Sequence, residues 1–260
     1  MIPAIIIAAC ILAKFYFMME WQTGKVIDIK NETATTKRYF IQIPSIEKFD
    51  FHPGQFVTLD LPIHEQKNKR WRSYSIASAP NGTNIFELVI VLLTGGAGTT
   101  YLFDFDEVKV GTELQIRGPQ GKFILPEELD KDLFLICTGT GIAPFRSMVQ
   151  YLHQNKIAHK KIHLIFGCRK LTDGLYINEL KELEMKEHNF FFHPVFSREE
   201  QATEGMYTGY VHGVYEKLIA EEKDPAKFYL CGWKNMIDEA KEKILSLGYD
   251  KKDIHLELYG

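Results

Sequence analysis

Two glycine-rich turns in this 260-residue sequence could bind phosphate, and the stronger is CTGTGIAPFRSM at 137–148. It follows an apolar, strand-length run directly and opens a segment of helical character. Gly139 and Gly141 let the backbone pass close to a ligand, while Pro144 suits the first turn of a helix. The free amides and the dipole at that helix start would face a pyrophosphate. A tight strand-to-helix connection is the plainer alternative, but this context favours nucleotide binding.

A second informative stretch, RSYSIAS at 72–78, lies on a predicted strand after a polar loop. Strand alternation places Arg72 and Tyr74 on one side, where a guanidinium could bind phosphate and an aromatic ring could stack on a flat heterocycle. An ordinary half-exposed strand is the alternative. Further on, GGAGTTYL at 95–102 offers bare amides, hydroxyls and a helix start. Two phosphate-type cradles in separate domains fit a dinucleotide flavin and a dinucleotide coenzyme.

The first half of the chain must position the RSYSIAS motif on a strand and the GGAGTTYL motif at a helix start. From Trp21 to about Leu125 it reads as short alternating runs, namely KVIDI, RYFIQI, QFVTLDL, SYSIAS, FELVIVLL and TELQI. Turn signals at HPG, PNG and GPQG separate them. This pattern predicts an antiparallel β-barrel or sandwich, interrupted only by a short helix around 100–105.

The second half has a different pattern of secondary structure. Its apolar, strand-length runs are separated by helical segments, and they are DLFLIC, KIHLIFG, FFFHPVF, KFYLC and IHLELY. The helices are expected at about 143–155, 176–187, 210–220 and 234–247. Strands that alternate with helices predict an α/β doubly wound parallel sheet covered on both faces. The charged stretch at 126–131 is the expected boundary, which gives domains at 19–127 and 128–260.

Seven motifs occur together in a fixed order: RSYSIAS, GGAGTTYL, GPQGKF, CTGTGIAPFR, VFSRE, YLCGWKNM and the terminal LELYG. In this order and spacing, the chain from about Trp21 to its end resembles the ferredoxin-NADP reductases and their flavoprotein relatives. The resemblance implies a flavin-binding antiparallel β-barrel followed by an NAD(P)-binding α/β domain. It also implies an oxidoreductase that uses FAD and NADPH or NADH.

On the flavin side, the resemblance gives each motif residue an expected role. Arg72 is expected to bind the FAD pyrophosphate, Tyr74 to pack against the isoalloxazine and ribityl, and Ser75 to lie near flavin N5. Thr99 takes the place of the hydroxyl residue in the second flavin motif, and Gly96 opens that turn. These positions would hold the flavin between the strand and the short helix.

On the coenzyme side, the resemblance assigns the pyrophosphate and the nicotinamide to the loop formed by Thr138, Gly139, Thr140 and Gly141, followed by Pro144. Cys231, with Gly232 beside it, falls where the family places a nicotinamide-proximal thiol. Glu257 matches the active-site carboxylate, and Tyr259 the aromatic that shields the other flavin face. The plainer readings are a small buried hydrophobe for Cys231, an exposed strand carboxylate for Glu257 and a frayed terminus for Tyr259.

The coenzyme preference depends on Ser197 and Arg198, where an adenosine 2'-phosphate would lie. Arginine can pair with a phosphate dianion, and Tyr207 could stack on adenine. Where plant-type reductases have a lysine, this sequence has Gly205, and NADH-linked relatives also carry a Ser-Arg pair. A solvated polar turn is the generic alternative. We therefore expect NADPH, with NADH as the alternative.

Composition narrows the partner classes. A net charge of −3 and a pI near 6.3 give no field for a nucleic acid backbone. The four cysteines are scattered, so neither a metal site nor an iron–sulfur cluster is expected. The expected partner is ferredoxin, flavodoxin or another electron-carrier protein. The basic side chains that could dock it, although solvated loops are the plainer reading, are Lys67, Lys69, Arg70, Lys109 and Lys122.

The first 18 residues, MIPAIIIAACILAKFYFM, are apolar apart from Lys14. They fall slightly short of the roughly 20 residues that cross a bilayer. We weigh a membrane anchor against a start-site artefact, with translation beginning at Met18 or Met19. The expected location is cytoplasmic, with membrane association only if this segment is an anchor.

Three functions remain open from the sequence. In the first, NADPH reduces FAD, which passes electrons singly to ferredoxin or flavodoxin. In the second, a membrane-tethered, NADH-dependent reductase supplies a cytochrome or an oxygenase. In the third, the chain is a flavin-binding electron-transfer or regulatory subunit without free turnover.

Overall fold

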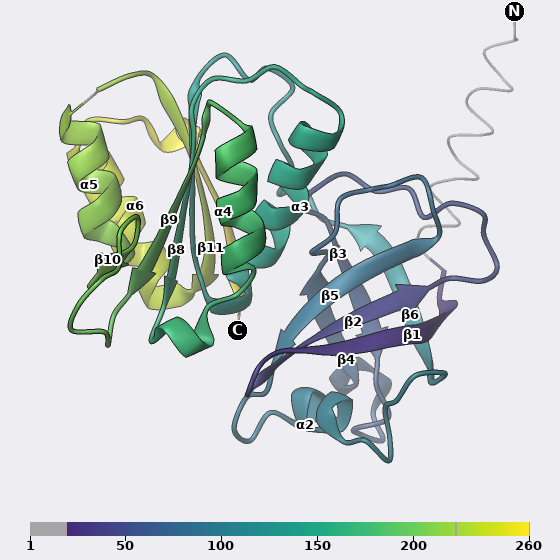
Figure 1. The fold of residues 1–260 in the computed structure, drawn as a ribbon. Helices are drawn as coiled ribbons and strands as arrows, with labels where there is room; N and C mark the ends of the chain where they lie inside the picture. The colour runs from purple at the N-terminus through teal and green to yellow at the C-terminus, as the bar shows by residue number, and fades with distance from the viewer. Residues whose placement is uncertain (1–19, 222, 260) are drawn as a thin grey trace, which may run out of the picture.

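The computed structural model describes residues 20–221 and 223–259 of the chain. The expectations for the apolar segment at 1–18 lie outside the described residues. Two six-stranded sheets lie side by side, one antiparallel and one parallel with helices on both faces (Figure 1). The predicted fold class, a β-barrel followed by a doubly wound α/β sheet, is confirmed.

The antiparallel sheet has the strand order β4-β3-β6-β1-β2-β5. Its strands are β1 (Gln22–Thr33), β2 (Thr36–Gln42), β3 (Phe56–Asp60), β4 (Trp71–Ser75), β5 (Ile85–Val91) and β6 (Glu113–Gln120). An isolated bridge between Ile76 and Leu88 brings the end of β4 to β5 and closes the sheet into a barrel. The barrel core contains Val26, Ile41 and Leu59, none of them exposed. These are the inward positions of the alternating runs in the sequence.

The short helix α2 (Ala97–Phe103) lies across one end of the barrel (Figure 1). It begins three residues before the position expected from the sequence. Gly96 precedes it with an extended backbone, and its carbonyl accepts the Thr100 amide at 2.9 Å. The buried Tyr39 hydroxyl donates to the Leu102 carbonyl at 2.6 Å, which fixes the helix to β2.

The parallel sheet has the order β10-β9-β8-β7-β11-β12. Its strands are β7 (Asp132–Thr138), β8 (Ile162–Cys168), β9 (Phe190–Phe196), β10 (Tyr207–Thr208), β11 (Ala226–Trp233) and β12 (Ile254–Tyr259). The four predicted helices are present as α3 (Ile142–Gln154), α4 (Ile177–Lys186), α5 (Val211–Glu221) and α6 (Lys234–Ser246). Among the described residues, no helix is both long and apolar enough to cross a membrane.

Two apolar cores cover the two faces of this sheet. Leu133 and Leu135 of β7 pack with α3 and α4, while Phe134 and Ile136 pack with α5 and α6. Figure 1 shows the two helix pairs on opposite sides of the strands. Because both faces are covered, the central strands are nearly continuous runs of apolar residues. The order of the strands reverses at β7, and ligands of such sheets bind at the carboxyl ends of the strands near that point.

Candidate active site

A cleft of about 1560 Å³ lies between the barrel and the carboxyl ends of the parallel strands. From the barrel, its predicted lining residues are Arg72, Tyr74, Ser75, Gly96 and Thr99. From the α/β half they are Thr138, Gly139, Thr140, Ser197, Gly232, Glu257 and Tyr259. Residues chosen from motifs across the whole chain therefore share one cavity, which is large enough for dinucleotides.

Ser75 meets two residues of β12 across the cleft. Its hydroxyl donates to Glu257 Oε1 at 2.8 Å, and the Tyr259 hydroxyl donates to Ser75 Oγ at 2.7 Å. Ser75 ends β4 and is only 5% exposed. The alternation of β12 directs Glu257 and Tyr259 to the same side of the strand. A carboxyl group and two hydroxyls thus form a chain that could orient a ligand or move a proton.

Burial controls the protonation of this chain. It raises the pKa of Glu257, although the hydrogen bond from Ser75 opposes the rise. Burial also raises the pKa of Tyr259 and of Cys231 well above their ordinary values. Cys231 has no exposed surface and pairs in register with Glu257, so it lies beneath the cleft instead of lining it. Its thiol is neutral at ordinary pH.

The flavin-side residues leave a cation and an aromatic ring available at the cleft. Arg72 donates only to the backbone carbonyls of Lys69 and Trp71, and in the described chain no carboxylate pairs with it. Gly98 lets this side chain lie against α2, since a Cβ there would be 2.8 Å from Arg72 Cγ. Burial raises the pKa of Tyr74 to about 12. An unpaired guanidinium beside a neutral ring fits a phosphate attached to a flat heterocycle.

The second-domain loop is built by close backbone approaches. A Cβ on Gly141 would lie 2.5 Å from the Cys231 carbonyl oxygen, and one on Gly232 would lie 2.6 Å from Thr138 Oγ1. Gly139 adopts a positive φ of 55°, which glycine allows without strain. Pro144 is buried in the first turn of α3. Within the described chain, Thr138 Oγ1 is buried without a hydrogen-bond partner, so this loop has an unused group for a dinucleotide.

The adenosine-side residues are only partly where the sequence placed them. Ser197 lines the cleft, but Arg198 and Tyr207 are not among the described residues that do. The Tyr207 ring packs against His193, with centroids 5.6 Å apart. Arg169 and Tyr210 line the cleft instead, and sequence reasoning missed both. Arg169 directly follows the last residue of β8, so its place after a parallel strand was the available signal.

Comparison with known proteins agrees with this two-part site. The oxidoreductase FAD-binding domain matches residues 23–124, and the oxidoreductase NAD-binding domain matches residues 135–242. Ferredoxin–NADP reductase B of Sorangium cellulosum is 32% identical over 232 residues, which cover 85% of this chain and 92% of that protein. The chain belongs to the ferredoxin–NADP reductase family. The barrel of this reductase is accordingly its FAD-binding part, and the α/β half is its NAD-binding part.

Two further proteins are similar to this reductase. The ferredoxin–NADP⁺ reductase of Neisseria gonorrhoeae, solved with bound FAD and NADP, has a TM-score of 0.75 and 25% identity, covering 92% of this chain and 98% of that one. The phenol hydroxylase P5 protein of Acinetobacter pittii is 32% identical over 238 residues. That match covers 90% of this chain but only 64% of the relative.

Proposed function

We propose that this reductase oxidises NADPH with bound FAD and delivers the electrons one at a time to a separate carrier protein such as ferredoxin or flavodoxin. The observation that carries the proposal is the hydrogen-bonded chain Glu257–Ser75–Tyr259, which joins the two halves inside a cleft large enough for both dinucleotides. When bound, FAD accepts a hydride from a nicotinamide and returns the electrons singly.

The residues of the chain position the reactants and exclude water. Arg72 holds the flavin phosphates by charge, and Tyr74 packs on the ring system. Thr99 Oγ1 accepts the Leu93 amide at 3.1 Å, so this hydroxyl holds the turn that precedes α2. Thr138 supplies its free hydroxyl to the coenzyme. Ser75 and Glu257 orient the nicotinamide, because hydride transfer needs close and aligned reacting atoms. Their hydrogen bond also holds a proton next to it.

The preference for NADPH is supported by the part of the cleft where we expect the adenosine to bind. Arg169 lies there with Ser197, and a guanidinium binds a phosphate dianion with charge-assisted hydrogen bonds. The Arg198 amide donates to the Arg169 carbonyl at 2.8 Å, so the turns that follow β8 and β9 and carry the two arginines lie side by side. NADH lacks the 2'-phosphate that these turns would bind.

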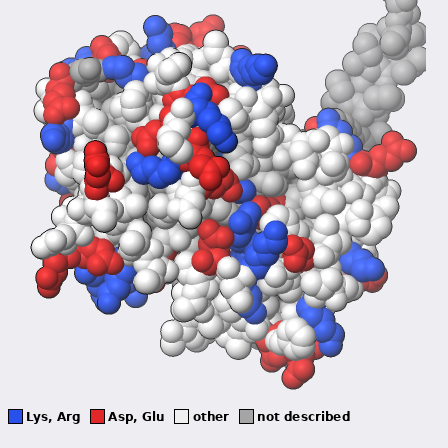
Figure 2. All heavy atoms as spheres, viewed as in Figure 1, with Lys and Arg blue, Asp and Glu red and all other residues white. Residues whose placement is uncertain are grey.

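The electron acceptor is a separate question from hydride transfer. A carrier protein is supported by the similarity to the Sorangium reductase along almost its full length. The alternative, an NADH-dependent reductase for an oxygenase, is supported by the similarity to the phenol hydroxylase P5 protein. On the face drawn in Figure 2, lysine and arginine are interspersed with aspartate and glutamate over both halves, so charge on this face does not favour one acceptor.

An anaerobic stopped-flow experiment tests the proposal. FAD-loaded protein is mixed with NADPH and, separately, with NADH, and the visible absorbance band of the oxidised flavin is followed. Fast bleaching with NADPH and slow bleaching with NADH are the expected results. Bound flavin that neither coenzyme bleaches would favour a subunit without free turnover. Adding ferredoxin, flavodoxin or an oxygenase component to the reduced protein then identifies the class of acceptor by the rate of reoxidation.

A further inference from the structure

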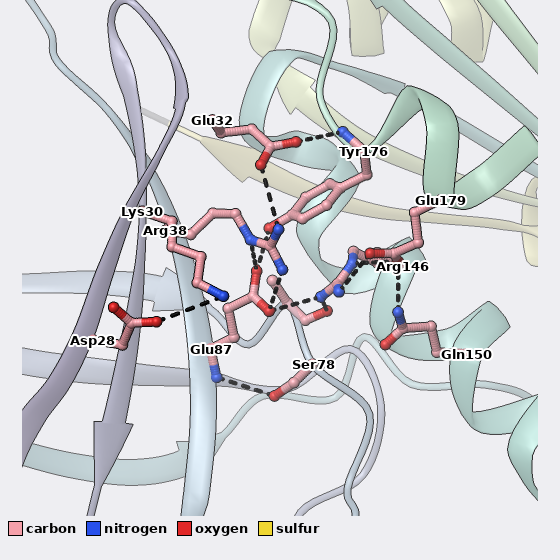
Figure 3. Close-up of polar contacts among 11 residues, drawn as sticks. Asp28, Lys30, Glu32, Arg38, Ser78, Glu87, Arg146, Gln150, Tyr176 and Glu179 are labelled. Carbon is pink, nitrogen blue, oxygen red and sulfur yellow. Dashed lines mark hydrogen bonds and ion pairs between the residues drawn. The ribbon is translucent and has the colours of Figure 1, made fainter.

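A buried carboxylate, Glu87 of β5, joins the two halves of the molecule beside the cleft (Figure 3). Glu87 Oε1 accepts Arg38 Nε at 2.6 Å and the Tyr176 hydroxyl at 2.7 Å. Oε2 accepts Arg38 NH2 at 3.0 Å and Arg146 NH1 at 3.1 Å. Arg38 belongs to the barrel, whereas Arg146 and Tyr176 belong to the α/β half. Four donors from three side chains therefore meet at one carboxylate between the two halves.

Arg146 extends this network to three parts of the structure. Its Nε and NH2 donate to the two carboxylate oxygens of Glu179 at 2.7 and 2.9 Å. Its NH1 also donates to the Ala77 carbonyl at 2.8 Å. Glu32 of β1 accepts the Tyr176 amide at 2.8 Å. One guanidinium thus ties α3 to α4, to β5 and to the segment that follows β4.

The centre of the network is buried. Glu87 is 3% exposed and Arg146 5% exposed. The Tyr176 ring lies near both guanidinium carbons, 4.8 Å from Arg38 and 4.2 Å from Arg146. Burial alone would raise the pKa of Glu87, but the hydrogen bonds and charges of Arg38 and Arg146 hold it below its ordinary value. Charges buried this way tolerate only one arrangement, since removing one leaves its partners unpaired.

The network is built on the segments that form the cleft. Arg146 lies in α3, which begins directly after the coenzyme loop at Gly139–Gly141. Ala77, whose carbonyl Arg146 binds, is two residues after Ser75. In the same segment Ser147 Oγ donates to the Ser78 carbonyl at 2.7 Å. The end of β4 that carries Ser75 is therefore attached directly to the helix that carries the coenzyme loop.

We infer that Arg146 and Glu87 are positioning residues for hydride transfer, which hold Ser75 and the flavin side in register with the coenzyme loop and Glu257. The inference rests on the proposed function. Neither side chain is among the described residues that line the cleft, so each acts by fixing the distance between the two halves of the cleft. A displacement of about 1 Å between reacting groups can slow a reaction by about a hundredfold.

The test uses FAD-loaded Arg146→Met, Glu87→Gln and Arg146→Lys in stopped-flow flavin reduction. At saturating coenzyme, the limiting rate should fall by about tenfold to a hundredfold in Arg146→Met and Glu87→Gln. The coenzyme concentration for half-maximal rate should change by less than about threefold, since the lost interactions are not contacts to the coenzyme. Arg146→Lys should give an intermediate rate, because a lysine keeps the charge but cannot bind both carboxylates.

Ile244→Ala is the matched control. Ile244 is fully buried in the second half of α6, away from the boundary between the two halves. It should lower the thermal midpoint while leaving the limiting rate per bound flavin unchanged. A normal limiting rate in all three network variants would overturn the inference and leave Glu87 and Arg146 with a purely structural role.

A further variant and a wild-type measurement complete the test. If Arg146→Met does not fold, Tyr176→Phe removes only one of the four donors to Glu87. It should still lower the limiting rate, and an unchanged rate in that variant would count against the inference. Wild-type protein is measured first: flavin that no coenzyme reduces would refute the proposed function, whereas normal wild-type reduction with unaffected variants would refute only the positioning role.

Discussion

Glu257 lies on an edge strand, where a carboxylate would ordinarily be solvated and charged, yet burial raises its pKa. The neutral form therefore persists to a pH above the ordinary value of 4.5. Because Ser75 donates to this carboxyl group, its ionisation changes the charge at the end of the hydrogen-bonded chain. The rate of flavin reduction should consequently depend on pH above 4.5, where the folded protein still binds this proton.

Replacing Glu257 with Gln keeps the acceptor for Ser75 but removes the ionisation. Glu257→Gln and Ser75→Ala should slow flavin reduction by about tenfold to a hundredfold while FAD stays bound. In Glu257→Gln, the pH-dependent step assigned to this carboxyl group should also disappear. Stopped-flow bleaching over a pH series measures both effects. Wild-type rates in both variants would remove the two residues from the reaction.

Two arginines compete for the role of binding the 2'-phosphate of NADPH. The lining of the cleft favours Arg169, whereas the Ser-Arg pair in the sequence favours Arg198. Arg169→Ala should raise the KM for NADPH about tenfold to a hundredfold, as expected when a charge-assisted hydrogen bond worth about 1.5–3 kcal/mol is lost. The KM for NADH should change little, because NADH carries no 2'-phosphate. Arg198→Ala is the matched comparison, and steady-state kinetics with both coenzymes measures the two variants. A larger NADPH-specific effect in Arg198→Ala would favour the assignment made from the Ser-Arg pair.

Individual residues were predictable where a motif fixes the backbone. Arg72, Ser75 and Glu257 each occupy a strand position, and alternation determines which side they face. Arg169 was missed because it follows its strand in a polar turn, CRKLTD, that contains no motif. Arg169 and Arg198 follow the neighbouring strands β8 and β9, and the side chain that reaches the cleft is decided by loop geometry, which these sequence patterns do not contain.

At the scale of elements, the junction between β7 and α3 depends on the small size of Gly141. Its φ of −60° suits any residue, so only space requires glycine there. An alanine Cβ would lie 2.5 Å from the Cys231 carbonyl oxygen and push α3 away from β11. Gly141→Ala should therefore cost about 1–3 kcal/mol of unfolding free energy, as overpacking usually does. It should also raise the KM for NADPH.

Gly213 in α5 is the matched control for this change. A Cβ there meets nothing within 4 Å, and the residue is in a helix. Gly213→Ala should stabilise the protein by about 0.5–1 kcal/mol through helix propensity alone. Denaturant unfolding of both variants measures the difference in sign. If Gly141→Ala is as stable as the wild type, the close approach of α3 to β11 does not constrain the loop.

The strands and helices were predictable because their patterns are local. Inward positions of the barrel strands alternate, and the central parallel strands are apolar on both faces. The start of α4 was less accurate: Tyr176 was expected to be helical, but it has a left-handed backbone with a φ of 55°. That conformation is costly for a non-glycine residue. It is held by tertiary contacts to Glu32 and Glu87 that no local pattern contains.

At the scale of the whole molecule, the contacts between the two halves were not predictable from the sequence. Arg38, Glu87 and Arg146 lie far apart in the chain, and each resembles an ordinary solvated charge when taken alone. Their burial depends on an apolar cluster that crosses the boundary, in which Ala77, Val89 and Phe123 of the barrel half pack with α3. Charges inside such a cluster should make the unfolding of one half depend on the other.

The three tryptophans allow this dependence to be measured. Trp21 and Trp71 belong to the barrel half, and Trp233 belongs to the α/β half. Trp233→Phe thus reports on the barrel alone, and the double variant Trp21→Phe with Trp71→Phe reports on the α/β half alone. With the network intact, a destabilising change in one half should lower the midpoint of both proteins, because breaking a buried ion pair costs about 3–5 kcal/mol.

Adding Arg146→Met to each protein should separate the two midpoints, because it removes the guanidinium of the α/β half that binds Glu87 and the Ala77 carbonyl of the barrel half. Adding Ile244→Ala, which lies within one half, should instead move both midpoints together while the halves stay coupled. A shift by Ile244→Ala in only one of the two proteins would show that the halves unfold independently. In that case the boundary would be an ordinary interface between domains that permits relative motion.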